Sequence, residues 1–214
     1  ARAAATLLLT VLTAATAWAE TKTVSYIDAD GNTQTVTATV LKSTYSVDDP
    51  EGFVGELEAG WYVVSTSFSY TSQVHTPTEG NTGTIHIILA DGAEMSVQNN
   101  SGGNAIYLGN QYPLAIYGQS AGTGRLTVTC ESDVTAIYAN GGFTINGGIV
   151  TATGKGTYRS GIYANQDFTI NGGQLTATGP SYYGISAETI TLGGGTITAN
   201  GGSGGYNGTV SIAL

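Results

Sequence analysis

The chain has 214 residues, of which 32 are glycine and 10% are charged, and its formal net charge is −9. This acidic balance and the lack of a basic patch argue against a nucleic-acid-binding protein. The high glycine content without a three-residue period excludes collagen and favours a fold with many tight corners. Cys130 is the only cysteine, so no disulfide can form within the chain. We expect it to be packed at a strand end rather than to be a reactive thiol.

Residues 1–19 have the composition of a secretory signal peptide. Arg2 precedes an apolar stretch over 3–15, and Ala17-Trp18-Ala19 fits the A-x-A cleavage pattern, which places the mature start at Glu20. The alternative is a membrane anchor, for which the apolar run is short. The sequence therefore predicts a secreted or cell-surface (extracellular) protein whose mature domain is not inserted in a membrane.

Residues 20–60 predict an N-terminal β-hairpin and a cap for the domain that follows. Alternating residues indicate strands at 24–27 and 35–41, joined by the turn sequence from Asp28 to Asn32. These turn residues resemble the start of a calcium loop, but no Glu follows at the twelfth position, so the hairpin turn is favoured. Residues 45–60 predict an acidic surface loop. Its acids are Asp48, Asp49, Glu51, Glu56 and Glu58.

Short strands follow one another from residue 61. The pattern predicts them at 61–65, 68–70, 84–89, 95–97, 105–108, 114–117 and 126–129, with corners at 90–93 and 119–124. Residues 72–83 predict a protruding loop. His75 lies in this loop and His86 at an outward position of the next strand, so we expect two surface histidines and no metal site.

Residues 136–201 contain three copies of one unit, which span 136–154, 161–179 and 184–201. Such a period is typical of a solenoid. Each copy holds three short strands in which alternate residues are apolar. Alignment of the copies gives six inward columns, for example Ile137, Ile162 and Ile185, and outward threonine columns such as Thr151, Thr176 and Thr198. Asn146 and Asn171 begin Asn-Gly-Gly corners, where positive φ is tolerated.

The pattern as a whole predicts an all-β protein. Its fold would be a right-handed parallel β-helix of about five to six coils over residues 61–214. One coil cannot bury enough apolar surface to fold alone, so stability must come from stacking. The chain starts without Met and ends within a strand pattern, and we expect it to be part of a longer protein.

Tyrosine is the main candidate for ligand binding. Tyr138 and Tyr163 are predicted to face outward in one column, and aromatic faces on a flat sheet can stack on sugar rings. The speculative carbohydrate-binding set also includes loop tyrosines and corner asparagines, namely Tyr158, Tyr182, Tyr183, Asn146 and Asn171. The alternative, which we favour, is that the stacked tyrosines only stabilise the sheet as cross-strand pairs.

No catalytic constellation is evident. The acids of the solenoid fall in different coils, and the basic residues Arg125, Lys155 and Arg159 are placed in loops. Asp167 and Glu188 come near one another in the alignment and are the candidate metal ligands for Ca²⁺. Solvated corner residues are the favoured interpretation of both, so we expect no cofactor and no enzyme activity.

The segments NAIYL, LAIYGQSAGTGRLTVT, AIYANGGFTINGGIVTATG and GIYANQDFTINGGQLTATG resemble secreted bacterial β-helix proteins of the carbohydrate-binding-domain family. Some relatives in that family are similar to calcium-containing, polygalacturonate-binding β-helix proteins. The resemblance covers residues 24–214, and AGWYVVSTSFSYTS and IHIILADGAEMSV fit the start of such domains. The calcium-containing relatives carry Asp around the Gly-Ile of each repeat. Residues 161–164 and 184–187 lack this Asp, so the resemblance does not imply calcium binding by this chain.

Three functions remain as hypotheses. The leading one is a secreted or surface-displayed, non-catalytic β-helix module that binds polysaccharide, or a host or cell-surface glycan, or acts as an adhesin. The second is a passive structural stalk or autotransporter-type passenger. The third is a polysaccharide lyase or hydrolase, which would need an acidic cluster that the columns do not show.

Overall fold

The computed structural model describes residues 20–44, 54–78 and 82–212. These residues form an all-β parallel solenoid of about six turns, so the sequence-based prediction of a parallel β-helix is confirmed. None of them belongs to a helix of the length and hydropathy that a bilayer span requires. The expected signal peptide at 1–19 lies outside the described residues.

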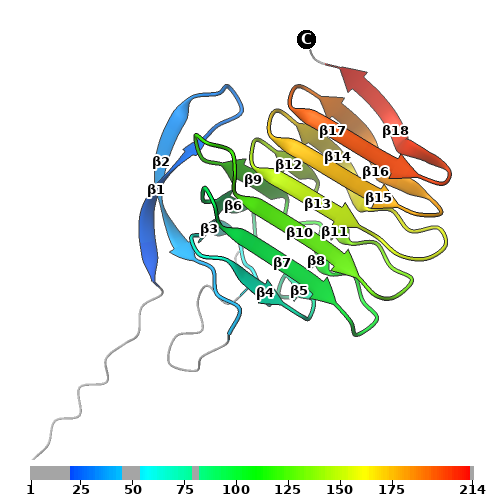
Figure 1. Ribbon diagram of the computed structural model, residues 1–214, viewed down its shortest axis with the longest axis horizontal. Coiled ribbons are helices and arrows are strands. Elements are labelled where there is room, and N and C mark those ends of the chain that lie inside the picture. The colour runs from blue at the N-terminus through cyan, green and yellow to red at the C-terminus, as the bar shows by residue number, and fades with distance from the viewer. Residues whose placement is uncertain (1–19, 45–53, 79–81, 213–214) are drawn as a thin grey trace, which may run out of the picture.

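The solenoid has three sides, each a ladder of parallel strands one turn apart (Figure 1). Side 1 consists of β5 (Val74–His75), β8 (Ile106–Leu108) and β11 (Ile137–Ala139). Side 2 consists of β3 (Gly60–Val64), β6 (Ile85–Leu89), β9 (Leu114–Gly118) and β12 (Phe143–Ile145). The longer strands β14 (Ile162–Ile170), β16 (Tyr183–Leu192) and β18 (Gly204–Ile212) run through the corner and contribute to both sides.

Side 3 is a separate six-stranded sheet. Its strands are β4 (Phe68–Tyr70), β7 (Glu94–Asn99), β10 (Arg125–Cys130), β13 (Ile149–Thr153), β15 (Gln174–Gly179) and β17 (Thr196–Gly201). Figure 1 shows these strands side by side across the front of the solenoid. Two details differ from expectation. Arg125 begins a strand, and His75 lies in the short strand β5 inside the predicted loop, where it pairs with Tyr107 of β8.

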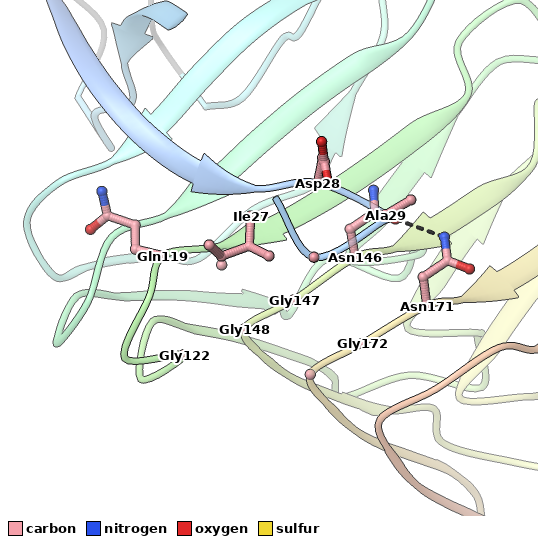
Figure 2. Close-up of a pocket in the computed structure, with 13 residues that line it drawn as sticks. Ile27, Asp28, Ala29, Gln119, Gly122, Asn146, Gly147, Gly148, Asn171 and Gly172 are labelled. Carbon is pink, nitrogen blue, oxygen red and sulfur yellow. Dashed lines mark hydrogen bonds between the residues drawn. The ribbon is translucent and has the colours of Figure 1, made fainter. Parts of the chain in front are cut away.

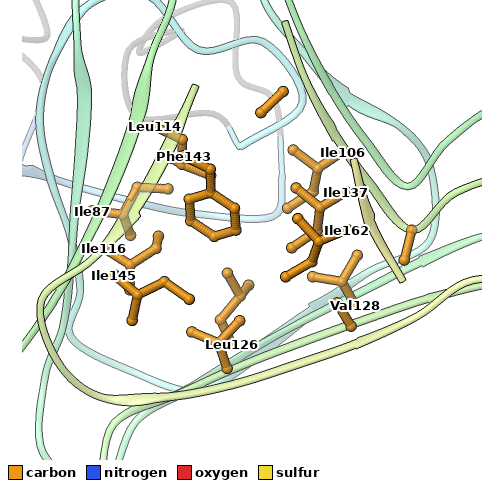
Figure 3. Packing of buried hydrophobic residues seen from close by; sticks show 14 of the residues in the cluster. Ile87, Ile106, Leu114, Ile116, Leu126, Val128, Ile137, Phe143, Ile145 and Ile162 are labelled. Carbon is orange, nitrogen blue, oxygen red and sulfur yellow. The ribbon is translucent and has the colours of Figure 1, made fainter. Parts of the chain in front are cut away.

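Every inward column predicted from the repeats is present. Ile137 pairs in register with Ile162, and Ile162 with Ile185. In the same way, Phe143 pairs with Phe168, and Phe168 with Ile190. Figure 3 shows the consequence in the lumen. Ile106, Ile137 and Ile162 form one wall, Ile87, Ile116 and Ile145 a second, and Leu126 and Val128 a third. The predicted threonine columns face outward.

Cys130 ends β10 and is buried, as expected from the sequence. Its Sγ lies 3.2 Å from the carbonyl oxygen of Val134. Burial raises the pKa of the thiol, which keeps it protonated and unreactive at neutral pH.

The predicted hairpin is formed by β1 (Thr21–Ile27) and β2 (Thr33–Val40), which pair antiparallel. Its turn is held by the Asp28 carboxylate, which accepts hydrogen bonds from the backbone nitrogens of Asp30 and Asn32. The Gln34 side chain also donates to this carboxylate, and Gly31 takes φ 82°. The predicted hairpin turn is therefore confirmed.

The hairpin extends side 2 through the pairing of β2 with β3 and folds against the outer surface of that side (Figure 1). Strand β2 thus lies at the edge of side 2, ahead of its first coil. Three buried residues between the hairpin and β3, namely Leu41, Val54 and Leu57, belong instead to the main core. Much of the predicted acidic loop, residues 45–53 with Asp48, Asp49 and Glu51, lies outside the described residues.

An aromatic cluster lies under the hairpin, and it corrects the expectation that His86 is a surface residue. His86 faces outward from its coil, but its ring stacks on Trp61 at 4.1 Å between centroids, with an interplanar angle of 6°. Its Nδ1 lies 3.1 Å from the Tyr117 hydroxyl, and Tyr26 of the hairpin packs on both Trp61 and Tyr117. His86 is therefore half-buried at the interface between hairpin and solenoid.

We predict that the glycine corners tolerate substitution only where no neighbouring coil is close. Gly173 has φ 82°, and an added Cβ would overlap the carbonyl oxygen of Gly148 in the preceding turn. Gly122 has φ 64° with no atom within 4 Å of that position. Gly122→Ala should cost about 1–2 kcal/mol through the left-handed backbone alone. Gly173→Ala should cost about 1–3 kcal/mol more through overpacking. Urea midpoints measure both, and equal midpoints would contradict the argument.

We predict that the hairpin loosens as the pH falls. Burial lowers the pKa of His86 from its ordinary 6.5. The unfolded chain therefore takes up a proton that the folded interface resists, and the stabilisation is complete above pH 6.5 and decreases as the pH drops toward the folded pKa. Hydrogen exchange of the β1 and β2 amides, corrected for intrinsic rates, should be faster at mildly acidic pH than at neutral pH. His86→Gln should remove this pH dependence, and unchanged protection in the native chain would refute it.

Candidate functional site

A single row of outward side chains runs along side 1, with one residue from each turn. Strand register places its seven members in one line, namely Glu56, His75, Tyr107, Tyr138, Tyr163, Ser186 and Asn207. We call this line the outer row. Neighbouring members are one strand apart, which is about 4.8 Å in a β-sheet. The solenoid thus repeats polar and aromatic groups at a fixed interval.

Three tyrosines form the centre of the outer row. The ring centroids of Tyr107 and Tyr138 are 5.4 Å apart, and those of Tyr138 and Tyr163 are 4.7 Å apart, with interplanar angles of 25° and 23°. The predicted outward column of Tyr138 and Tyr163 is therefore confirmed. Sequence reasoning missed Tyr107. The shared motif Ala-Ile-Tyr, at 105–107 and 136–138, was the signal that could have found it.

The stacking changes how these rings can contact a ligand. Both faces of the Tyr138 ring are turned toward its two tyrosine neighbours, which leaves neither face open for stacking on a sugar ring. Ring edges and hydroxyl groups are the parts that remain for contacts outside the stack. Burial, followed by the neighbouring tyrosines, raises the pKa of Tyr138, so its hydroxyl stays a protonated donor at neutral pH.

Polar groups accompany the tyrosines. Asn165 follows Tyr163 by two residues, and its Oδ1 accepts a hydrogen bond of 3.0 Å from the Tyr163 hydroxyl. The Asn207 side chain donates to the Ser186 hydroxyl over 3.1 Å further along the row. At the other end, His75 Nδ1 lies 3.9 Å from the Glu56 carboxylate. None of these contacts was expected from the sequence.

A hollow of about 260 Å³ adjoins Tyr107, whose side chain is 41% exposed. Its lining includes Thr76, Asn110, Gln111 and Tyr112. Thr76 Oγ1 accepts a hydrogen bond from the backbone nitrogen of Gly109, which fixes one wall. Neutral hydroxyl and amide groups beside aromatic rings suit a ligand with many hydroxyl groups.

The remaining tyrosines of the predicted set lie at the corner between sides 3 and 1. Tyr158 has φ 60° and is 72% exposed, and its ring meets that of Tyr182 edge-on at 5.8 Å. Tyr182 meets Tyr183, the first residue of β16, at 4.4 Å with 63° between the planes. They form a cluster of edge contacts rather than a continuation of the stacked row.

Asn146 and Asn171 lie at a different corner, between sides 2 and 3, so the structure does not bring them together with the tyrosines. They line a hollow of about 250 Å³ between the hairpin turn and the Asn-Gly-Gly corners (Figure 2). Asn171 Nδ2 donates to Asn146 Oδ1 over 2.8 Å, and Asn146 also hydrogen-bonds the Tyr117 hydroxyl.

Gln119, in the same hollow, joins the solenoid to the hairpin. Its Oε1 accepts from the backbone nitrogen of Asp91, and its Nε2 donates to the carbonyl oxygen of Ser25. Since the amides of Asn146, Asn171 and Gln119 all bond within the protein, this hollow has a structural explanation.

The acids expected near a metal are out of register. A register shift after Ala164 pairs Asp167 with Thr189, so Glu188 does not face Asp167 as the alignment suggested. Both acids are exposed. Among the described residues, no group of three or more potential ligands gathers into a metal site. The loop cations are engaged with acids, since Lys155 lies 2.9 Å from Glu131 and Arg159 lies 3.2 Å from Asp133.

Comparison with known proteins adds no relative to this picture. No family model, no curated protein and no solved structure matches the chain.

Proposed function

We propose that the protein is a secreted or cell-surface, non-catalytic β-helix module that binds polysaccharide, with the outer row as its contact surface. The observation that carries the proposal is the stack of Tyr107, Tyr138 and Tyr163 on the outside of side 1. The residues of the outer row repeat at the strand interval. Its three tyrosines each combine an apolar ring with a polar hydroxyl, which suits a ligand that is partly apolar and partly polar.

The rigidity of the row favours binding. Tyr138 stacks between two tyrosines, Tyr107 and Tyr163 each stack on one, and all three lie on strands, so little side-chain entropy remains to be lost on association. Tyr163 is further oriented by Asn165. A polysaccharide needs many hydrogen-bonding groups in fixed places, and a solenoid provides them without any large conformational change.

The residues favour binding over catalysis. General acid–base chemistry needs two groups within hydrogen-bond reach of one reacting centre. Asp167 and Glu188 are out of register, and Lys155 and Arg159 are each held by an acid. A passive stalk or autotransporter-type passenger is the alternative, in which the tyrosine stack would serve only as a chain of cross-strand pairs.

We predict that the double substitution Tyr138→Ala with Tyr163→Ala weakens binding to polysaccharide by at least about tenfold, which is about 1.4 kcal/mol. A panel of plant, mucin and bacterial polysaccharides, with and without a calcium chelator, identifies the ligand. Thr151→Ala with Thr176→Ala is the matched control, because these residues face outward on side 3 of the same two turns. This control should bind like the native chain.

Circular dichroism and urea midpoints establish that both variants remain folded. Full binding by the folded tyrosine variant would refute the role of the outer row. A native chain that binds no member of the panel would favour the stalk. Loss of binding with the chelator would show that a divalent cation takes part in binding.

A further inference from the structure

We infer that the ligand is an uncharged, linear polysaccharide that lies lengthwise along the solenoid axis. The tyrosine hydroxyls and ring edges of successive turns contact its successive sugar residues. This inference rests on the proposed function and specifies its ligand. It concerns the direction, the length and the charge of that ligand, and each of these follows from a separate feature of the outer row.

The direction follows from the width of the row. Strands β8 and β11 are each three residues long, and only their middle residues, Tyr107 and Tyr138, face outward between two buried neighbours. A ligand that crosses the strands therefore meets one tyrosine. A ligand that runs along the solenoid axis meets all three, together with the exposed Asn207 further along the row, whereas Ser186 between them is buried.

The length follows from the spacing. Seven positions separated by about 4.8 Å span about 29 Å from Glu56 to Asn207, and the three tyrosines span about 10 Å. One strand interval is close to the length that one pyranose residue adds to an extended chain. A disaccharide extends over about 10 Å and can therefore reach the tyrosines alone, whereas a chain with one residue for each turn contacts the whole row.

The mode of contact follows from the stacking. Because Tyr138 has a tyrosine against each face and Tyr107 and Tyr163 each have one covered face, the groups that all three rings offer to the ligand are the hydroxyl ends and the edges. The hydroxyls repeat at the strand interval and can hydrogen-bond to successive sugar residues, with that of Tyr163, which already donates to Asn165, as an acceptor. Replacing Tyr by Phe keeps the stack and removes only the hydroxyls, which separates this mode from stacking on ring faces.

The charge follows from the residues in and around the row. The row contains Glu56 and no Lys or Arg, and the chain carries a net charge of −9. His75, the one basic side chain in the row, faces that carboxylate. Arg159 and Lys155 are paired with acids. A polyuronate would place a carboxylate at every turn against this surface with no cation of the row to receive it, and it would be repelled.

The experiment measures the affinity of the intact chain for oligosaccharides of defined length. The probes are cello-, xylo- and manno-oligosaccharides from the disaccharide to the octasaccharide, and oligogalacturonates of the same lengths. In at least one neutral series the affinity should rise by at least about tenfold between the disaccharide and the hexasaccharide. The oligogalacturonate hexamer should bind at least about tenfold more weakly at low salt, and added salt should reduce the difference by screening.

The second arm tests the hydroxyls. The triple variant Tyr107→Phe, Tyr138→Phe and Tyr163→Phe should lose at least about tenfold in affinity for the hexasaccharide while its urea midpoint stays close to that of the native chain. The matched control is Thr151→Val with Thr176→Val, which removes two hydroxyls from side 3 of the same turns. Tyr138→Phe alone serves if the triple variant does not fold.

The outcomes separate this inference from the proposed function. Affinity that does not change with length, equal or stronger binding of oligogalacturonate, or native affinity in the folded Phe variants would each overturn the inference while leaving polysaccharide binding in place. Binding to none of the glycans would overturn both.

Discussion

The structure depends on the register between successive turns. Each strand hydrogen-bonds to the strand one turn before and one turn after, so residues that pair must occupy the same place in their turns. This constraint explains why residues of the same type recur at equivalent positions of successive turns. Ile137, Ile162 and Ile185 are alike because each forms the inner wall at the same point. It also explains the corners, where Gly148, Gly173 and Gly195 take φ of 79°, 82° and 80° so that each turn can lie directly on the last.

The same register that builds the core also builds the surface. A side chain that faces outward in one turn lies beside its counterpart in the next turn. The register alone therefore arranges chemically similar residues in rows. The consequence depends on what covers the row. On side 2, Trp61 and His86 stack in this way, but the hairpin covers them and they become part of an interface. On side 1, Tyr107 remains 41% exposed.

The parts that were predictable from the sequence are those that repeat. The inward columns, the threonine columns and the Asn-Gly-Gly corners were all evident, because three copies show the same residue at the same place. Val74 and His75 were not recognised as a strand, because two residues carry no measurable periodicity and Pro77 follows closely. Their strand is imposed by the pairing of His75 with Tyr107, a contact between turns that local sequence does not encode.

The place of the hairpin was unpredictable for a related reason. Its two strands and turn are local features, but its contact with the solenoid joins residues far apart in the chain, as in the bond from Gln119 to Ser25. Alternation within the strand correctly placed His86 on the outside of the coil. It could not reveal that Tyr26 and the rest of the hairpin would cover this residue.

The stabilising and ligand-binding interpretations of the tyrosine stack do not compete. Stacking between Tyr107, Tyr138 and Tyr163 adds cross-strand contacts to a sheet whose strands on side 1 are short. The same contacts hold the rings in one orientation, so the hydroxyls are placed before any ligand arrives. A ligand at this surface therefore benefits from an order that folding has already produced. A straight row of like side chains along a solenoid is thus a by-product of the register that the fold itself requires.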